Sequence, residues 1–266
     1  MNLENLNTFN IGTIKDISLS YLLKIDSYPS VREYQKSNNY TQERLNQELR
    51  KFTLKKHHAV YSSEMENVSS EYGIDVQEMF QSKLVNFFLS KLTEKELKQI
   101  YYHSGKPNQF LFSSSDLSDK YNEFNNFLIN SFSYISETYD WILLPNQTFN
   151  QLLYENNWFA MNFQRLEKTP ESENKMIQYN GNLTIKNKHF PVYTSTLFPF
   201  QNDPKLQLIF GKSDWGEITF LPPNHEITKD LFQIQPKNGE EWDVVLGMYI
   251  KSIYPTKRGF MRIEIS

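Results

Sequence analysis

The chain has 266 residues, of which 39% are hydrophobic and 22% charged, so it can bury a sizeable core as one large domain or two small ones. The formal net charge of −3 argues against a dedicated nucleic-acid binder, which should carry a basic face. The absence of cysteine excludes disulfides, thiolate chemistry and cysteine-ligated zinc sites.

The first 55 residues are polar and only weakly patterned. One apolar patch lies at residues 19–25, and Thr41 to Lys51 predict a short helix with Thr41 as its N-cap. The sequence KFTLKKHHAVYSS that follows mixes strand-like and basic character. We therefore expect residues 1–55 to form an N-terminal arm and extended-loop region, ordered mainly by its neighbours.

The strongest helical signal lies just after this region. Residues 62–72 predict a helix that ends at Gly73, and Asp75 can cap a second helix. The second helix should run to about Tyr101, because apolar residues recur at helical spacing: Val76, Met79, Phe80, Leu84, Phe87, Phe88, Leu92, Leu97 and Ile100. At about 1.5 Å per residue this helix would be roughly 40 Å long, which is long for a domain of this size.

The middle of the chain predicts two helices around a buried strand. Residues 119–138 have the pattern of one amphipathic helix, with these side chains inward: Phe124, Phe127, Leu128, Phe132 and Ile135. The fully apolar WILLP at 141–145 is typical of a strand in the middle of a sheet. Asn146 is the expected N-cap of a short helix after it.

The C-terminal third is rich in strands. Residues 183–195 predict a hairpin with Asn187 and Lys188 at its turn. Further strands, each ended by Gly, Pro or the chain terminus, are expected in QLIFGKS, GEITFLPP, WDVVLGMYIKSIYP and FMRIEIS. The last of these alternates apolar and polar residues from Phe260 onward. No linker clearly separates two autonomous domains, so the predicted fold class is α+β.

Motifs for phosphate binding, a nucleophile elbow or a zinc peptidase are absent from the sequence. Of the five histidines, only His57 and His58 are near each other, and adjacent residues on a strand point to opposite faces. The pair is therefore a poor chelate. Together with Lys55 and Lys56 it could contact phosphate, but we favour a solvated or interface arm.

Two pairs of glutamates, Glu64 with Glu66 and Glu94 with Glu96, could be interpreted as paired carboxylates. Residues two apart on a helix do not face each other, so we expect solvated faces instead of acid/base dyads. The tryptophans are expected to anchor the core or an interface: Trp141, Trp158, Trp215 and Trp242. We predict no catalytic, cofactor-binding or metal-binding residue, and no cofactor.

Four stretches, in order, resemble the major capsid protein of T-even-type tailed phages. The first, 61–100, matches a helix, a turn and a long helix; the second, 121–153, matches a helix, strand and helix. The third, 179–214, and the fourth, 216–266, match the family's later strands. The residues that carry the resemblance are Glu64, Gly73, Asp75, Asn180, Gly181, Val192, Tyr193, Gly211, Lys212, the FQIQP motif at 232–236, Phe260 and Arg262.

The resemblance implies the Hong Kong 97-type phage capsid fold, with a long spine helix and with peripheral and axial domains. The implied divisions are an arm and extended loop at 1–55, a peripheral domain at 56–138 with the spine helix at about 75–101, a mainly axial domain at 139–215, and C-terminal strands returning to the peripheral domain at 216–266. The chain is much shorter than T-even subunits, so we expect the family's insertion domain to be absent.

The resemblance also implies a function without catalysis. It implies a major capsid protein of a tailed double-stranded DNA phage that self-assembles into hexamers and pentamers of an icosahedral shell. The implied partner is the chain itself, with portal, scaffold and decoration proteins as further candidates, and the shell would enclose DNA without sequence-specific binding. The implied location is the virion, after assembly in the host bacterial cytoplasm.

Two features of the sequence agree with this location, and three other functions stay open. The start of the chain lacks a signal-peptide pattern, and no apolar run reaches the roughly 18 residues that span a bilayer, so no membrane association is expected. The alternatives are the pentameric vertex protein, another virion component and, remotely, an α+β enzyme. An enzyme would need a concave cluster of titratable residues.

Overall fold

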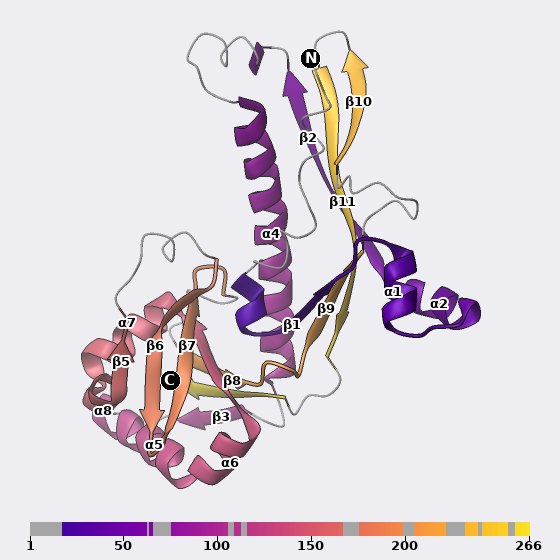
Figure 1. The fold of residues 1–266 in the computed structure, drawn as a ribbon. Helices are drawn as coiled ribbons and strands as arrows, with labels where there is room; N and C mark the ends of the chain where they lie inside the picture. Colours follow the sequence, from indigo (N-terminus) through magenta and orange to yellow (C-terminus); the bar gives the residue numbers. More distant parts are fainter. Residues whose placement is uncertain are drawn as a thin grey trace. The chain divides into compact units, whose positions relative to one another are not determined.

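A computed structural model describes residues 18–62, 64–65, 76–105, 109–112, 116–166, 176–198, 205–221, 232–238, 241–254 and 259–266. The chain divides into two compact units (Figure 1). Among the described residues, the first unit holds those within 25–91 and 217–253, and the second holds those within 18–24, 92–216 and 254–266. Each unit combines helices with one sheet, so the predicted α+β class is confirmed.

The first unit is built on a five-stranded sheet whose long strand β11 pairs antiparallel with β10, β2 and β9, while β1 pairs with β9. The strands are β1 (Lys24–Ser27), β2 (Thr53–Ser62), β9 (Glu217–Leu221), β10 (Phe232–Asn238) and β11 (Glu241–Ile253). The basic segment expected to be ordered by neighbouring subunits is therefore ordered within the chain, because β2 pairs with β11 from Thr53 to Ser62.

Two short helices of the first unit lie within the segment predicted as an arm and extended loop. They are α1 (Val31–Ser37) and α2 (Gln42–Leu49), and together with the sheet they form a small core of Tyr34, Leu45, Phe52 and Leu221. The predicted cap of α2 is confirmed, since the Thr41 side chain accepts a hydrogen bond from the Arg44 backbone N–H. Local caps and burial of Tyr34 and Leu45 therefore contribute to the order of this weakly patterned segment.

The long helix α4 (Val76–His103) confirms the helix predicted at about 75–101. Its buried apolar residues include Leu84, Phe88, Leu92, Leu97 and Ile100. Met79 and Phe87, which belong to the same apolar pattern, are exposed. Long as α4 is, neither it nor another helix in the described ranges is apolar enough to cross a membrane. Glu64 and Met65 are helical, whereas Glu66, Gly73 and Asp75 lie outside the described residues.

The second unit contains a mixed seven-stranded sheet in the order β3-β12-β8-β4-β7-β6-β5. The strands are β3 (Gln109–Phe112), β4 (Trp141–Pro145), β5 (Phe163–Arg165), β6 (Gln178–Ile185), β7 (Lys188–Ser195), β8 (Leu206–Gly211) and β12 (Phe260–Ile265). The central position predicted for WILLP is confirmed: β4 lies between β8 and β7, and all five of its residues are buried. In the hairpin, Lys186 and Asn187 form the turn, one residue earlier than predicted, because Lys186 adopts a φ of 52°.

The helices of this unit are α5 (Leu117–Asn130), α6 (Phe132–Thr138), α7 (Asn146–Glu155) and α8 (Asn157–Asn162), and the 3-10 helix η3 (Ser18–Tyr21) belongs to the same unit. The single helix predicted at 119–138 is wrong, since Ser131 leaves helical geometry and separates α5 from α6. The interruption still leaves Phe124, Leu128 and Ile135 fully buried in one core. The N-cap of α7 is Pro145, and Asn146 is the first helical residue.

Candidate functional site

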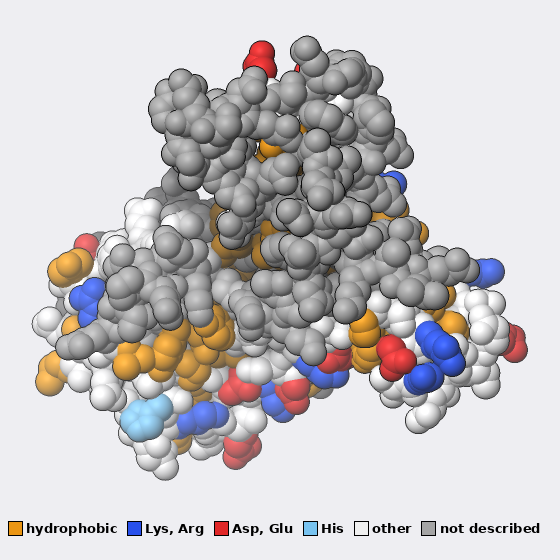
Figure 2. All heavy atoms as spheres, turned by 45° about the horizontal axis from the view of Figure 1, so that its top comes forward, with side chains coloured by type: hydrophobic (Ala, Val, Ile, Leu, Met, Phe, Trp, Pro, Cys, Tyr) orange, Lys and Arg blue, Asp and Glu red, His pale blue; other side chains and the backbone are white. Residues whose placement is uncertain are grey.

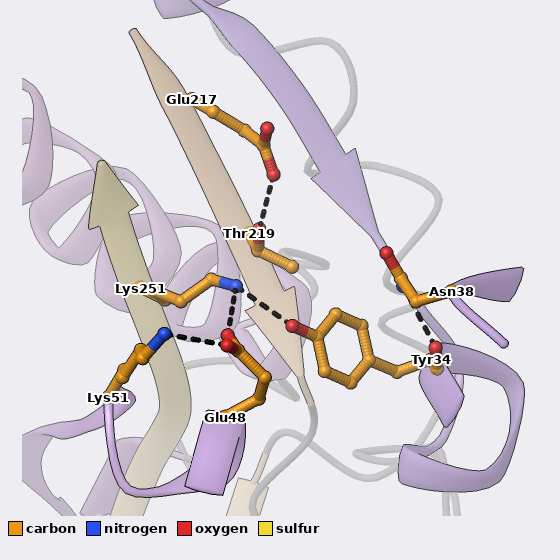
Figure 3. A network of polar contacts seen from close by, with 7 residues as sticks. All are labelled: Tyr34, Asn38, Glu48, Lys51, Glu217, Thr219 and Lys251. Atoms are coloured by element: carbon orange, nitrogen blue, oxygen red, sulfur yellow. Dashed lines mark hydrogen bonds and ion pairs between the residues drawn. The ribbon is translucent and has the colours of Figure 1, made fainter. Parts of the chain in front are cut away.

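A buried lysine joins the two small helices of the first unit to its sheet. Lys251 on β11 is 5% exposed, and its Nζ donates a hydrogen bond of 2.8 Å to the Tyr34 hydroxyl. The same Nζ lies 3.4 Å from Oε2 of Glu48 and 5.1 Å from the centroid of the Phe52 ring. Figure 3 shows the Lys251 ammonium group pointing toward the Tyr34 hydroxyl and the Glu48 carboxylate. A buried cation needs such partners, because desolvating an unpaired charge is costly.

The charge states of this Lys251 centre, made of Lys251, Tyr34 and Glu48 with Lys51 beside them, follow from its geometry. Burial raises the pKa of Tyr34 above the usual range of a phenol, and the neighbouring Tyr40 adds to this. A hydrogen bond from Lys51 lowers the pKa of Glu48, despite the opposing effect of burial, and the charge of Lys251 acts in the same direction. The centre is therefore a buried ion pair with a hydrogen-bonded phenol, an arrangement that stabilises structure.

A second buried charge overturns one prediction. Glu96 on α4 is fully buried, where we expected a solvated face, and it accepts a hydrogen bond of 2.7 Å from the Tyr254 hydroxyl. Glu94 stays near the surface and pairs with Lys98 at 2.7 Å. Positions two apart on a helix are about 200° apart around its axis, so one glutamate faces inward when the other faces outward. Burial raises the pKa of Tyr254, and the charge of Glu96 adds to this effect.

A third set of buried polar side chains, Arg262 and Glu264, lies on β12. All six residues of this strand are buried, although its sequence alternates apolar and polar residues. Arg262 and Glu264 lie two apart on the strand and therefore share a face. The Arg262 Nε is 3.0 Å from the Glu264 Oε1, and the guanidinium stands 4.1 Å from the centroid of the Tyr101 ring. The alternation found in the sequence is real, but its polar face is covered by protein.

The histidine and lysine candidates do not form a site in the described part of the chain. In β2, His58 is paired in register with Val245, and its side chain is exposed, as is that of Lys56. His225 and the side chain of His57 lie outside what the structure describes. Within the described ranges, no group of three or more His, Asp or Glu side chains is arranged to hold a metal ion.

The tryptophan prediction is confirmed for Trp141, which is 1% exposed. A β-carbon added at Gly211, a residue that carries the capsid resemblance, would lie 2.2 Å from the Trp141 ring, so the strand there has room only for glycine. Trp158 and Trp215 are part-buried, and the side chain of Trp242 lies outside the described set.

Two hollows were not anticipated from the sequence. One, of about 400 Å³, lies in the first unit and is lined by Val31, Asn46, Leu49, Arg50, Phe52, Leu221 and Tyr249. The other, of about 520 Å³, lies in the second unit and is called the Trp158 hollow below; it is lined by Ser118, Tyr121, Asn122, Asn125, Glu155, Asn156, Asn157, Trp158 and Met161. The asparagines at 122, 125, 156 and 157 were the one available signal, and in an Asn-rich chain that signal is weak.

Solved structures share this fold. The chain is similar to the holo-SrpI encapsulin complex from Synechococcus elongatus PCC 7942, with a TM-score of 0.51 and 8% identity over 80% of this chain and 73% of that one. It is also similar to the capsid of cyanophage P-SCSP1u, with a TM-score of 0.50 and 7% identity over 81% of this chain and 72% of that one. The predicted Hong Kong 97-type capsid fold is therefore confirmed.

The sequence itself finds no counterpart: no protein-family model matches the chain, and no curated protein matches it. At 7–8% identity the structural likeness shows the fold alone. The resemblance to T-even capsid proteins consequently stays a prediction from the four stretches.

Proposed function

We propose that the chain is a shell subunit, the major capsid protein of a tailed double-stranded DNA phage. The observation that carries this proposal is the Hong Kong 97-type fold, which extends over 80% of the chain. The solved structures that share this fold include an encapsulin complex and a cyanophage capsid. The narrower assignment to a T-even-like lineage rests on the sequence resemblance.

The buried charges support a structural role over a catalytic one. Each buried charge has an internal partner: Lys251 pairs with Glu48, and Arg262 pairs with Glu264. Glu96 pairs with Lys95 at 2.9 Å and also accepts a hydrogen bond from the Tyr254 hydroxyl. Such centres connect strands to helices and would keep each unit rigid when neighbouring subunits bind. We infer from this that the chain is not an enzyme. Measurable turnover that tracks a substitution at one of these residues, with the fold intact, would contradict the inference.

The mechanism proposed is assembly by repeated contact between copies. Closed shells need many modest interfaces related by symmetry, and aromatic residues and Met are enriched in such interfaces. Several large apolar side chains are exposed in the described part: Val60, Met79, Phe87, Tyr102, Phe110, Leu111, Tyr134, Tyr154, Met161, Leu166 and Ile253. Among the described side chains visible in Figure 2, acidic and basic groups are interspersed. This agrees with a shell that encloses DNA without binding it tightly.

Electron microscopy of the purified recombinant protein tests the proposal directly. We expect closed shells, tubes or separate capsomers, formed by the chain alone or after addition of its scaffold protein. Sedimentation of the same sample should show species far heavier than the 31.7 kDa chain. A protein that remains monomeric at high concentration and high salt, while folded by circular dichroism, would contradict the proposal.

Copy number in purified virions separates the major capsid protein from the alternatives. On the order of hundreds of copies is expected for a protein that fills the hexamer positions of a symmetric shell. A vertex protein would occupy only the pentamers, and a tail or accessory head protein would be present in about a dozen copies. Portal, scaffold and decoration proteins should appear in the same virions if the phage assignment is right.

A second candidate is the subunit of an encapsulin-type compartment, since the likeness to an encapsulin is as good as that to a phage capsid. The contents of native particles distinguish the two. Nuclease-protected DNA supports the phage capsid and its place in the virion. Particles that hold protein cargo and no DNA support the compartment.

A further inference from the structure

The Trp158 hollow has the size of a small-molecule site and belongs to no structural centre described above. It is formed by residues of α5 on one side and by the end of α7 with α8 on the other. Its volume of about 520 Å³ falls within the range of about 300–1,000 Å³ that is usual for ligand pockets.

Trp158 provides the hollow with an aromatic surface that no other ring covers. The rings nearby are paired: Phe149 lies 5.2 Å and Phe159 5.8 Å from Phe163, centroid to centroid. Trp158 is part-buried and packs against the hydrophobic core of the unit, but within the described part of the chain it makes no such ring contact. A tryptophan that borders a hollow without a ring partner in the described part of the chain offers a surface for a flat apolar group.

The polar groups of the hollow are mostly neutral amides. Asn125 and Asn156 exchange hydrogen bonds of 3.2 and 3.0 Å and hold each other in place on the floor. The side chains of Ser118, Asn122 and Asn157 line the hollow and make no side-chain hydrogen bond within the described part of the chain. An amide presents a donor and an acceptor together, which is what a hydroxyl group on a ligand can pair with.

The charges around the hollow exclude one class of ligand. Asp116, Asp119, Glu123 and Glu155 lie on or beside α5 and α7, and the described residues of α5, α7 and α8 contain only one cation, Lys120. Glu155 accepts hydrogen bonds from the Tyr121 hydroxyl at 2.8 Å and from Gln151 at 2.9 Å, so its position is held. Phosphates, sulfates and acidic peptides would be repelled here.

We propose that the Trp158 hollow binds a neutral carbohydrate. The C–H face of a sugar ring carries a weak positive potential and stacks on the electron-rich face of an indole. The hydroxyl groups around the ring would pair with the amides of Asn122 and Asn157 and with the Glu155 carboxylate. This assignment does not depend on shell assembly, since every residue involved belongs to the second unit of a single chain.

Saturation-transfer difference NMR of the intact protein tests the proposal with four probes: maltose, cellobiose, lactose and N,N′-diacetylchitobiose, each at up to about 10 mM. At least one of them should bind, and Trp158→Ala should weaken that binding about tenfold or more. Glucose 6-phosphate, tested in the same way, should not bind. Failure of all four sugars to bind the folded protein would overturn the proposal.

Matched variants distinguish sugar binding in the hollow from non-specific binding and from misfolding. Tyr154 is 86% exposed and lies outside the hollow, so Tyr154→Ala should leave sugar binding unchanged. Asn157→Ala removes one exposed amide and should weaken binding without lowering the melting temperature. Equal losses from Tyr154→Ala and Trp158→Ala would overturn the proposal. A third outcome would also overturn the proposal: the parent protein binds no sugar, and Trp158→Ala prevents assembly. The hollow would then be a contact between subunits.

Discussion

The cores of the two units are built differently. Among the described residues, the seven-stranded sheet of the second unit buries 20 hydrophobic side chains in one cluster, whereas the α1–α2 segment of the first unit shares a cluster of four. The larger core can rely on shape and apolar burial. The smaller one adds the Lys251 centre, where one ammonium group contacts both helices and the sheet. The second unit should therefore be destabilised most by steric changes in its packing. The α1–α2 segment of the first unit should be destabilised most by loss of a charge partner.

The largest effect should come from overfilling the tightly packed sheet of the second unit beside Trp141. In Gly211→Ala the new β-carbon would lie 2.2 Å from the ring of buried Trp141. We expect a loss of about 3 kcal/mol or more in the free energy of unfolding, measured by urea titration of the unassembled subunit. Gly105→Ala is the matched control, because its nearest neighbour would be a backbone oxygen at 3.3 Å, and it should cost at most about 1 kcal/mol.

The next largest effect should come from the small core. Lys251→Met removes the cation that pairs with Glu48 and hydrogen bonds to Tyr34, at a site only 5% exposed. Breaking such a pair should cost about 2–3 kcal/mol, with protection from proteolysis lost first in residues 31–49. Lys51→Met removes the more exposed partner of the same carboxylate and should cost less than about 1 kcal/mol. Equal losses of unfolding free energy in the two variants would show that burial does not determine how much the Lys251–Glu48 pair stabilises the fold.

A buried polar pair in the second unit, outside its hydrophobic cluster, sharpens the comparison further. Asn156 is 2% exposed, caps α8 by accepting from the Phe159 N–H at 3.1 Å, and pairs with Asn125. Asn156→Ala removes the cap and leaves a buried amide without its partner, so we expect a loss of about 2 kcal/mol by thermal or urea unfolding. Asn157→Ala, at the exposed neighbouring position, should change stability by about 0.5 kcal/mol or less.

The smallest effect is a pH dependence confined to the small core. The pKa of Glu48 is lowered in the folded chain, chiefly by its hydrogen bond to Lys51. Its contribution to stability should be complete above the unfolded pKa of about 4.3 and should disappear as the pH falls through the lowered folded value. Melting temperatures of the parent protein and of Glu48→Gln should therefore converge on acidification. Glu33→Gln, which breaks the exposed pair with Lys36, is the control for a surface ion pair and should cost at most about 0.5 kcal/mol at neutral pH.

Local signals in the sequence were sufficient for features that depend on near neighbours along the chain. The spacing of apolar residues predicted α4, five consecutive apolar residues predicted the buried strand β4, and Thr41 was recognised as the cap of α2. The position of Ser131 could not be recognised as a break, because the apolar spacing continues across it into α6. Periodicity reports which face is apolar, and a short interruption does not change that face.

What the sequence determined by itself was therefore the kind and order of elements, and with them the α+β class and the resemblance to capsid subunits. What only the tertiary structure decided was which polar groups are buried. Glu96, Arg262 and Lys251 look like surface residues in the sequence, yet each is covered by elements distant along the chain. The same holds for the Trp158 hollow, whose two sides are about thirty residues apart. Burial depends on what packs against a face, and no local pattern contains that information.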